Sequence, residues 1–256
     1  MTRAKAIAIQ VLPPLLPLLV VGILAELAVQ RGWVPRYLVP APSIIAKTLL
    51  NEQDLWRAAG ETALAAGVGF ALSALVGLLI AILLSSSRWV QRTFYPYAVL
   101  FQTVPIIAIA PMLVIWIGYG MPTVIASAFI VSVFPVIANA LNGLRSTDPA
   151  LVDLFKLHGA GTPITLWKLR LPFALPAILN GLRVAGGLAV IGAIVGEFIT
   201  GGGLGGIIDI SRTQQRIDKV FAVLLIASGL GIALFGLVNC ITWITLRHWH
   251  ASEKSD

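Results

Sequence analysis

Charged residues are scarce in this sequence: Lys, Arg, Asp and Glu make up 11% of the 256 residues, whereas 58% are hydrophobic. With a mean hydropathy of +0.92, the chain has too little polar surface for a water-soluble domain of this size. We therefore expect an integral membrane protein. The net charge of +7 does not indicate nucleic acid, because no Lys/Arg cluster is interleaved with aromatic residues and basic residues of membrane proteins usually face the anionic cytoplasmic leaflet.

Several kinds of chemistry are also missing. The single cysteine, Cys240, lies within an apolar run, so an intrachain disulfide is excluded. The histidines have no Cys, Asp or Glu at metal-ligand spacing, so we expect no metal site at His158, His248 or His250. No Gly-x-x-x-x-Gly-Lys-[Ser/Thr] loop occurs, so this chain cannot itself cradle the phosphates of ATP. We expect a protein that is not an enzyme and binds no cofactor; any work that it does would draw energy from a partner or an ion gradient.

Long apolar runs predict an all-α membrane protein with six membrane-spanning helices. A helix of about 20 apolar residues crosses a hydrocarbon core of about 30 Å. The charge-free run 94–144 would be about 76 Å long as one helix, so we expect the segment Gly118-Tyr119-Gly120-Met121-Pro122 to divide it. The first run is too long for a typical signal peptide and contains prolines, so we expect it to be retained. The predicted spans are residues 11–29, 62–84, 94–117, 121–144, 174–199 and 221–246.

The distribution of basic residues predicts the orientation. With the N-terminus inside, the inner segments hold more Lys and Arg than Asp and Glu: Arg3, Lys5, Arg88, Arg92, Arg145, Lys156, Lys168, Arg170, Arg247 and Lys254 against Asp148, Asp153, Glu253 and Asp256. The outer segments are more balanced: Arg31, Arg36, Lys47, Arg57, Arg212, Arg216 and Lys219 against Glu52, Asp54, Glu61, Asp209 and Asp218. A positive inner side predicts that both termini and the connection 145–172 are cytoplasmic.

The connection 145–172 has the signals of two short helices. Asp148 and Pro149 are a typical helix start, and Gly159 is suited to a left-handed cap at the end. A second start at Thr162-Pro163 predicts a helix to about Arg170, ended by Leu171-Pro172. In the first helix, Leu151, Leu154, Phe155 and His158 share one face. That face could rest on headgroups, pack on the chain's own spans, or dock into a groove of another protein.

This connection resembles the cytoplasmic "EAA" signature of permease subunits of bacterial ABC importers. The signature has Glu-Ala-Ala, a glycine after three further residues, and Leu-Pro twelve and thirteen positions past that glycine. Here Asp153, Leu154 and Phe155 stand at the first three positions, followed by Gly159 and by Leu171-Pro172. The spacing is intact, although aspartate replaces glutamate and larger apolar residues replace the alanines. The resemblance assigns coupling to a partner ATPase to Asp153, Leu154, Phe155, His158, Gly159, Leu171 and Pro172.

Three further segments resemble the branch of these importers that carries nitrate, sulfonates, taurine or bicarbonate, and also thiamine- or riboflavin-related compounds. They are RYLVPAPSIIAKTL at 36–49, FQTVPIIAIAPMLVIWIGYG at 101–120 and LPFALPAILNGLRVAGGLAVIGAIVGEFITGGGLGGII at 171–208. The resemblance implies one domain over 1–256 with its core at 60–246, in the bacterial inner membrane. It also implies a second copy of the chain, two cytoplasmic ATPases that use ATP and Mg, and an external solute-binding protein.

Few polar groups are candidates for a translocation path. Pro105 would release a backbone carbonyl in the third span, which needs a wet cavity or another partner, so Gln102 and Thr103 beside it are candidate lining residues. A bend that only improves packing is the alternative. Glu197 precedes a glycine-rich segment and is either part of an outer gate or a structural hydrogen-bond partner. Glu26 and Arg183, near span ends, are expected to reach the interfaces.

Small residues three or four apart in the fifth span predict a close helix seam, either within the subunit or across a dimer: Gly181, Ala185, Ala189, Gly192 and Gly196. Together these features predict a permease subunit that moves a small polar or anionic solute by alternating access. An ion-coupled secondary transporter is one alternative, but it would need titratable or Na⁺-coordinating groups near the midplane. A non-transporting membrane scaffold is the other, although it would have no need of kinked, polar-lined spans.

Overall fold

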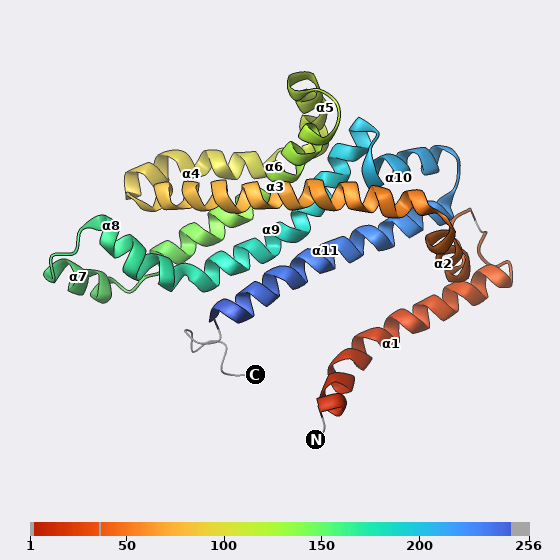
Figure 1. Cartoon of the computed structure of the whole chain (residues 1–256), viewed down its shortest axis with the longest axis horizontal. Coiled ribbons are helices and arrows are strands. Elements are labelled where there is room, and N and C mark those ends of the chain that lie inside the picture. The colour runs from red at the N-terminus through yellow and green to blue at the C-terminus, as the bar shows by residue number, and fades with distance from the viewer. Residues whose placement is uncertain (1–2, 36, 247–256) are drawn as a thin grey trace.

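The computed structural model describes residues 3–35 and 37–246, with side chains from Leu16 onward (Figure 1). Every regular element in this part of the chain is a helix, which confirms the predicted all-α class. His248, His250 and several charges used for the orientation lie outside the described residues: Arg36, Arg247, Glu253, Lys254 and Asp256.

Three long helices form the centre of the molecule, α3 (Gln53–Ser85), α6 (Met121–Arg145) and α9 (Leu171–Thr200), and α11 (Ile217–Leu246) packs along α9 (Figure 1). Small side chains let these helices approach closely: fully buried Ala65, Ala66, Ala128 and Ala193 belong to one core cluster. The Ser73 hydroxyl of α3 lies 2.6 Å from that of Ser132 on α6, so polar groups inside the bundle bind each other rather than lipid.

The remaining elements surround this centre. They are α1 (Arg3–Gln30), α2 (Pro42–Asn51), α4 (Arg88–Thr103), α5 (Ile106–Ile117), α7 (Pro149–Leu157), α8 (Thr162–Thr165), the π-helix η1 (Leu166–Arg170) and α10 (Gly203–Thr213). Figure 1 shows α7 and α8 at one end of the bundle and α2 and α10 at the other, with α1 standing apart except where it meets α2. The two ends of the bundle therefore carry different structures.

The described residues support fewer spans than the six predicted. Four helical stretches are long and apolar enough to cross a membrane: Gln53–Ser85, Met121–Arg145, Thr162–Thr200 and Ile217–Leu246. A fifth is present if α4 and α5 together make one span. The predicted first span lies in α1, whose described side chains form only a shorter apolar stretch, Leu16–Gln30. The break between the third and fourth runs is where it was predicted, because Gly118 and Gly120 have φ of +96° and +101° there.

The prediction of one kinked helix over 94–117 is wrong. Two helices bent by 97° occupy this region, and the first of them begins at Arg88. Val104 is extended, as a residue before proline prefers, and Pro105 then starts α5. The bend is larger than a proline kink because the helical hydrogen bonding stops altogether over two residues, rather than losing a single bond.

Candidate coupling loop and translocation surface

Local capping fixes both ends of α7. The Asp148 carboxylate accepts a hydrogen bond from the backbone N–H of Ala150 at 2.8 Å, and Pro149 occupies the first turn, as predicted. At the other end Gly159 has a φ of +71°, and its N–H donates to the carbonyl of Lys156 at 2.9 Å. The N–H of Ala160 donates to the carbonyl of Phe155 at 3.0 Å, which completes a left-handed cap. The helix is thus closed at both ends by its own sequence.

The rest of the described chain leaves much of the apolar face of α7 uncovered. No residue of this helix is buried. Leu154 is 47% exposed and Leu157 84% exposed, whereas Phe155 is only half-buried. Asp153 and Lys156 pair with each other at 2.9 Å on the surface, and the His158 ring bonds the Leu154 carbonyl within the same helix. The exposed leucines make α7 an amphipathic helix whose apolar face is only partly covered by the described residues.

The second predicted helix does not end at Leu171-Pro172, so that prediction is wrong. Helix continues from Thr162 through η1 into α9 and reaches Thr200. Pro172 lacks an N–H and would leave a carbonyl of the preceding turn without its bond. The π-turn relieves this, since the N–H of Leu171 donates five residues back to the carbonyl of Leu166. The loop is therefore connected to α9 by continuous helix and not by a hinge.

At the opposite end of α9, Glu197 is 2% exposed and joins three helices. Its Oε2 accepts hydrogen bonds from the Thr62 hydroxyl of α3 at 2.9 Å and from the backbone N–H of Gly205 at 3.0 Å. The Leu204 N–H donates to the Thr62 hydroxyl oxygen at 3.0 Å. Because the first N–H groups of a helix lack partners within it, Glu197 and Thr62 together cap α10. Sequence reasoning missed Thr62, which lies 135 positions from Glu197.

The structure does not bring the candidate path residues together. Gln102, Thr103 and Pro105 are all exposed at the bend between α4 and α5, where the Thr103 hydroxyl donates to the carbonyl of Leu100 at 2.8 Å. Glu197 instead borders a cavity of about 200 Å³ at the start of α6, which it shares with Glu61, Gly120, Met121, Val124, Thr200, Gly202 and Gly203. The predicted path residues therefore form two separate groups.

The small residues of α9 lie at its contact with α6. A Cβ added at Gly192 would lie 2.7 Å from the Ser127 carbonyl oxygen, and one at Gly181 would lie 2.8 Å from Asn139 Cβ. Gly196 is similarly close to Val124 and Ser127, and Ala185 and Ala189 are fully buried. This geometry places the seam within the subunit.

The two remaining candidate charges also have partners inside the chain. Glu26 accepts from the backbone N–H of Ser43 at 3.0 Å and from its hydroxyl at 2.7 Å, which ties α1 to α2. The guanidinium of Arg183 lies 5.7 Å from the ring centre of Phe235 on α11. Both charged groups therefore take part in contacts between helices.

An ion-pair network that sequence reasoning did not identify joins the start of α3 to the start of α11. Glu52 accepts from Arg216 at 2.7 Å and from Lys219 at 2.8 Å, and Lys219 also contacts Asp54 at 2.6 Å. The hydrogen bonds from Lys219 and Arg216 lower the pKa of Glu52 from its ordinary value of 4.5. The sequence did contain a signal for this network. The segments that hold Glu52 and Arg216 carry acidic and basic residues in near balance, and both are predicted to lie on the outer side.

Comparison with known proteins agrees with this architecture. Residues 73–242 match the family described as "Binding-protein-dependent transport system inner membrane component". A "Probable ABC transporter permease protein" of Haemophilus influenzae is 38% identical over 236 residues, which cover 90% of this chain and 95% of the relative. A "Formylaminopyrimidine transport permease protein" of Halalkalibacterium halodurans is 35% identical over 240 residues, covering 93% and 96%.

The fold also matches a solved structure, the inward-facing MetNI methionine ABC transporter, with a TM-score of 0.66 and 20% identity over 75% of this chain and 96% of that one. At this identity the match concerns the fold alone. The family match covers most of the chain, and the two relatives align over nearly all of it. The chain therefore belongs to the family of inner membrane components of binding-protein-dependent transport systems, and it is the permease subunit of an ABC importer whose ATPase is a separate chain.

Proposed function

We propose that two copies of this chain form the translocation path of the importer and move a small solute inward by alternating access. Each copy would cross the membrane six times, with α1 as the first span and both termini in the cytoplasm. The excess of basic residues on the predicted inner side supports this orientation. Because the chain belongs to this family, two alternatives considered from the sequence are dropped: an ion-coupled secondary transporter and a non-transporting scaffold.

In this proposal residues 145–172 are a cytoplasmic coupling loop. The observation that carries it is the apolar face of α7, a helix that is capped at both ends and leaves Leu151, Leu154 and Leu157 exposed in the described chain. An amphipathic helix of this kind docks by laying its apolar face into a groove, here on a partner ATPase that binds ATP and Mg. Asp153, Leu154, Phe155, His158 and Gly159 would be the contact region, with the exposed Leu157 beside Leu154, and Leu171 and Pro172 would pass its movement along α9.

The solute proposed is a small polar compound, taken from an external solute-binding protein. Nitrate, sulfonates, taurine, bicarbonate and vitamin precursors are the classes considered from the sequence. The name of the Halalkalibacterium halodurans relative, a formylaminopyrimidine permease, favours a vitamin precursor. Gln102, Thr103 and Pro105 at the α4–α5 bend and Glu197 beside the 200 Å³ cavity are the proposed path residues. Because Gln102, Thr103 and Pro105 are exposed, a second copy of the chain would have to pack against the α4–α5 bend to enclose such a path.

Reconstitution in liposomes tests transport. The permease is assembled with its partner ATPase and binding protein, and radiolabelled aminopyrimidine is placed on the side of the binding protein. We expect uptake that requires ATP inside and stops when the ATPase is omitted. Uptake driven by an ion gradient with the permease alone would refute the proposal. Sulfonate, taurine and nitrate serve as competitors, and displacement by one of them rather than by pyrimidines would correct the solute class.

A matched pair of variants tests docking of α7. Leu157 on α7 and Leu50 on α2 are 84% and 83% exposed, so a glutamate at either position disturbs no packing. We expect Leu157→Glu to abolish co-purification of the ATPase and Leu50→Glu to leave it intact. Gly159→Pro and Asp153→Arg should also release the ATPase without preventing membrane insertion, since proline cannot adopt the φ of +71° at position 159. Normal ATPase recovery with Leu157→Glu, Gly159→Pro and Asp153→Arg would contradict the coupling assignment.

Single cysteines test the topology. In a Cys240→Ala background, a cysteine at Leu157 should react with an impermeant maleimide only in inverted vesicles. A cysteine at Asp54 should react only in right-side-out vesicles. The opposite pattern would reverse the proposed orientation.

A further inference from the structure

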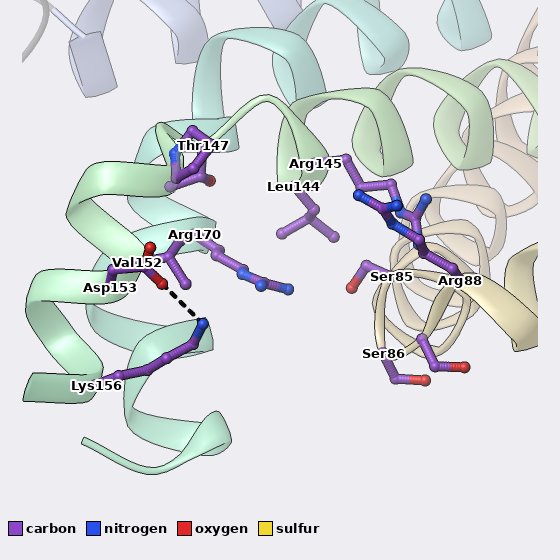
Figure 2. Close-up of a pocket in the computed structure, with 12 residues that line it drawn as sticks. Ser85, Ser86, Arg88, Leu144, Arg145, Thr147, Val152, Asp153, Lys156 and Arg170 are labelled. Atoms are coloured by element: carbon purple, nitrogen blue, oxygen red, sulfur yellow. Dashed lines mark hydrogen bonds and ion pairs between the residues drawn. The ribbon is translucent and has the colours of Figure 1, made fainter. Parts of the chain in front are cut away.

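A cavity of about 410 Å³ lies at the end of the bundle that carries α7 (Figure 2). Its walls come from the junction of α3 and α4, the end of α6 and the residues after it, one side of α7, and η1. Cations dominate the lining, with Arg88, Arg145, Arg170 and Lys156, and Asp153 is the one acidic residue among the described residues that line it. Figure 2 shows Arg88 and Arg145 together on one wall, with the guanidinium of Arg170 extending from the opposite wall.

These arginines have no counter-ion in the described chain. Asp153 is paired with Lys156 at 2.9 Å. Among residues 3–35 and 37–246, no carboxylate oxygen lies within 4.0 Å of a side-chain nitrogen of Arg88, Arg145 or Arg170. Three guanidinium groups that line one cavity repel each other, and an anion bound among them would offset that repulsion. The contrast with the opposite end is clear, where Arg216 and Lys219 are both paired with carboxylates.

Two buried polar atoms at the cavity also lack partners. Thr147 is 6% exposed and its Oγ1 has no hydrogen bond among the described residues. The Nε of Arg170 is buried and unpartnered in the same way. Because buried polar groups in proteins are nearly always satisfied, two such atoms at one cavity indicate a missing partner that accepts hydrogen bonds. The first turn of α4, capped by Ser87, borders the same space and adds the positive end of a 16-residue helix.

The surroundings of the cavity place it at membrane-interface depth. Trp89 follows Arg88, Trp167 lies on η1, and the two are 71% and 67% exposed, as expected of tryptophans among lipid headgroups. A smaller adjoining cavity of about 180 Å³ shares Arg170 and is walled by Ile82 and Leu166, so apolar surface lies directly beside the charged space. A ligand with a phosphate and an acyl chain fits both features.

We propose that Arg88, Arg145 and Arg170 form a binding site for a phosphate group, delivered by an anionic phospholipid such as phosphatidylglycerol. Guanidinium groups bind phosphate oxygens by paired, charge-assisted hydrogen bonds, and basic pockets at the ends of membrane helices recognise such headgroups. The same chemistry would also accept free inorganic phosphate. The cavity adjoins the proposed ATPase contact region at Asp153, but Leu154 and Leu157 do not line it.

Native mass spectrometry of the purified, delipidated permease without its ATPase tests this site. Phosphatidylglycerol, phosphatidylcholine and inorganic phosphate are titrated separately. We expect one tightly held phosphatidylglycerol per chain, and about a fivefold loss of affinity for each arginine removed in Arg88→Gln, Arg145→Gln and their double variant. Arg145→Lys should retain part of the affinity. Lys168→Gln is the matched control, because it removes a charge from the same end of the molecule without touching the cavity.

The separate titrations distinguish the phosphate of a lipid headgroup from free inorganic phosphate. Saturable binding of inorganic phosphate that is lost in the double variant, without preference for phosphatidylglycerol, assigns the site to soluble phosphate. Equal binding of both lipids and no binding of phosphate would overturn the proposal. So would a double variant that binds phosphatidylglycerol normally but loses the ATPase, since the missing anion would then be a carboxylate of the partner. A thermal melt of each variant verifies that the fold is retained.

Discussion

Replacing Glu197 tests the capping of α10 most directly. In Glu197→Ala, the N–H of Gly205 loses its acceptor beside a side chain that is only 2% exposed, whereas the hydroxyl of Thr62 can still donate to the carbonyl of Ala58 at 3.0 Å. An unsatisfied buried donor costs about 1–3 kcal/mol. Relief of the desolvation of the buried carboxylate offsets part of this, which leaves about 2 kcal/mol. Glu197→Gln keeps one carbonyl oxygen in place, and we expect it to cost about 1 kcal/mol.

Hydrogen exchange of the α10 amides measures this effect locally. A loss of 2 kcal/mol corresponds to about 30-fold faster exchange at Leu204 and Gly205 if these amides open locally. Amides in the middle of α6 should be unchanged. Thr200→Ala is the control, because Thr200 borders the same cavity but bonds only to its own helix, at the carbonyl of Gly196. Unchanged exchange in Glu197→Ala, or equal effects of alanine and glutamine, would refute the capping argument.

Two further predictions concern the seam and the ion-pair network. Gly192→Ala should lower the free energy of unfolding by about 1–3 kcal/mol, because its Cβ would press on the backbone of α6, whereas Gly187→Ala, which meets nothing within 4 Å, should be neutral or slightly stabilising in a thermal melt. Glu52 has a lowered pKa in the folded protein, so its stabilising contribution is present above pH 4.5 and is lost as the pH falls through the lowered value. Glu52→Gln should remove about 1 kcal/mol at pH 7 and reduce this acid sensitivity.

Comparison of each variant with its matched reference tests both predictions. Equal melting temperatures for Gly192→Ala and Gly187→Ala would show that α6 moves aside without cost and that the seam is loose. If Glu52→Gln and the wild type lose stability in parallel between pH 6 and pH 3, another carboxyl group is responsible for the acid sensitivity.

Sequence reasoning was most accurate where local chemistry decides the structure. The caps at Asp148 and Gly159 and the turn at Gly118–Gly120 follow from a few adjacent residues. It was less accurate at prolines: Pro105 broke its helix by 97°, whereas Pro172 did not end one. The same residue type had opposite outcomes because η1 rearranges the bonding before Pro172, while Val104 becomes extended before Pro105. The partner of Glu197 was out of reach, since Thr62 meets it only after α3, α9 and α10 have packed.

The continuous helix from Thr162 to Thr200 has a mechanical consequence. Its 39 residues correspond to about 58 Å along a helix axis, longer than the membrane core is thick, with α7 near one end and the capped α10 at the other. If such a helix pivots at its middle by 10°, each end is displaced by about 5 Å in opposite directions. A small displacement of one helix end would then produce a displacement of similar size and opposite direction at the other end, across the membrane. The helix can act as a lever in this way because the π-turn of η1 keeps it continuous across Pro172.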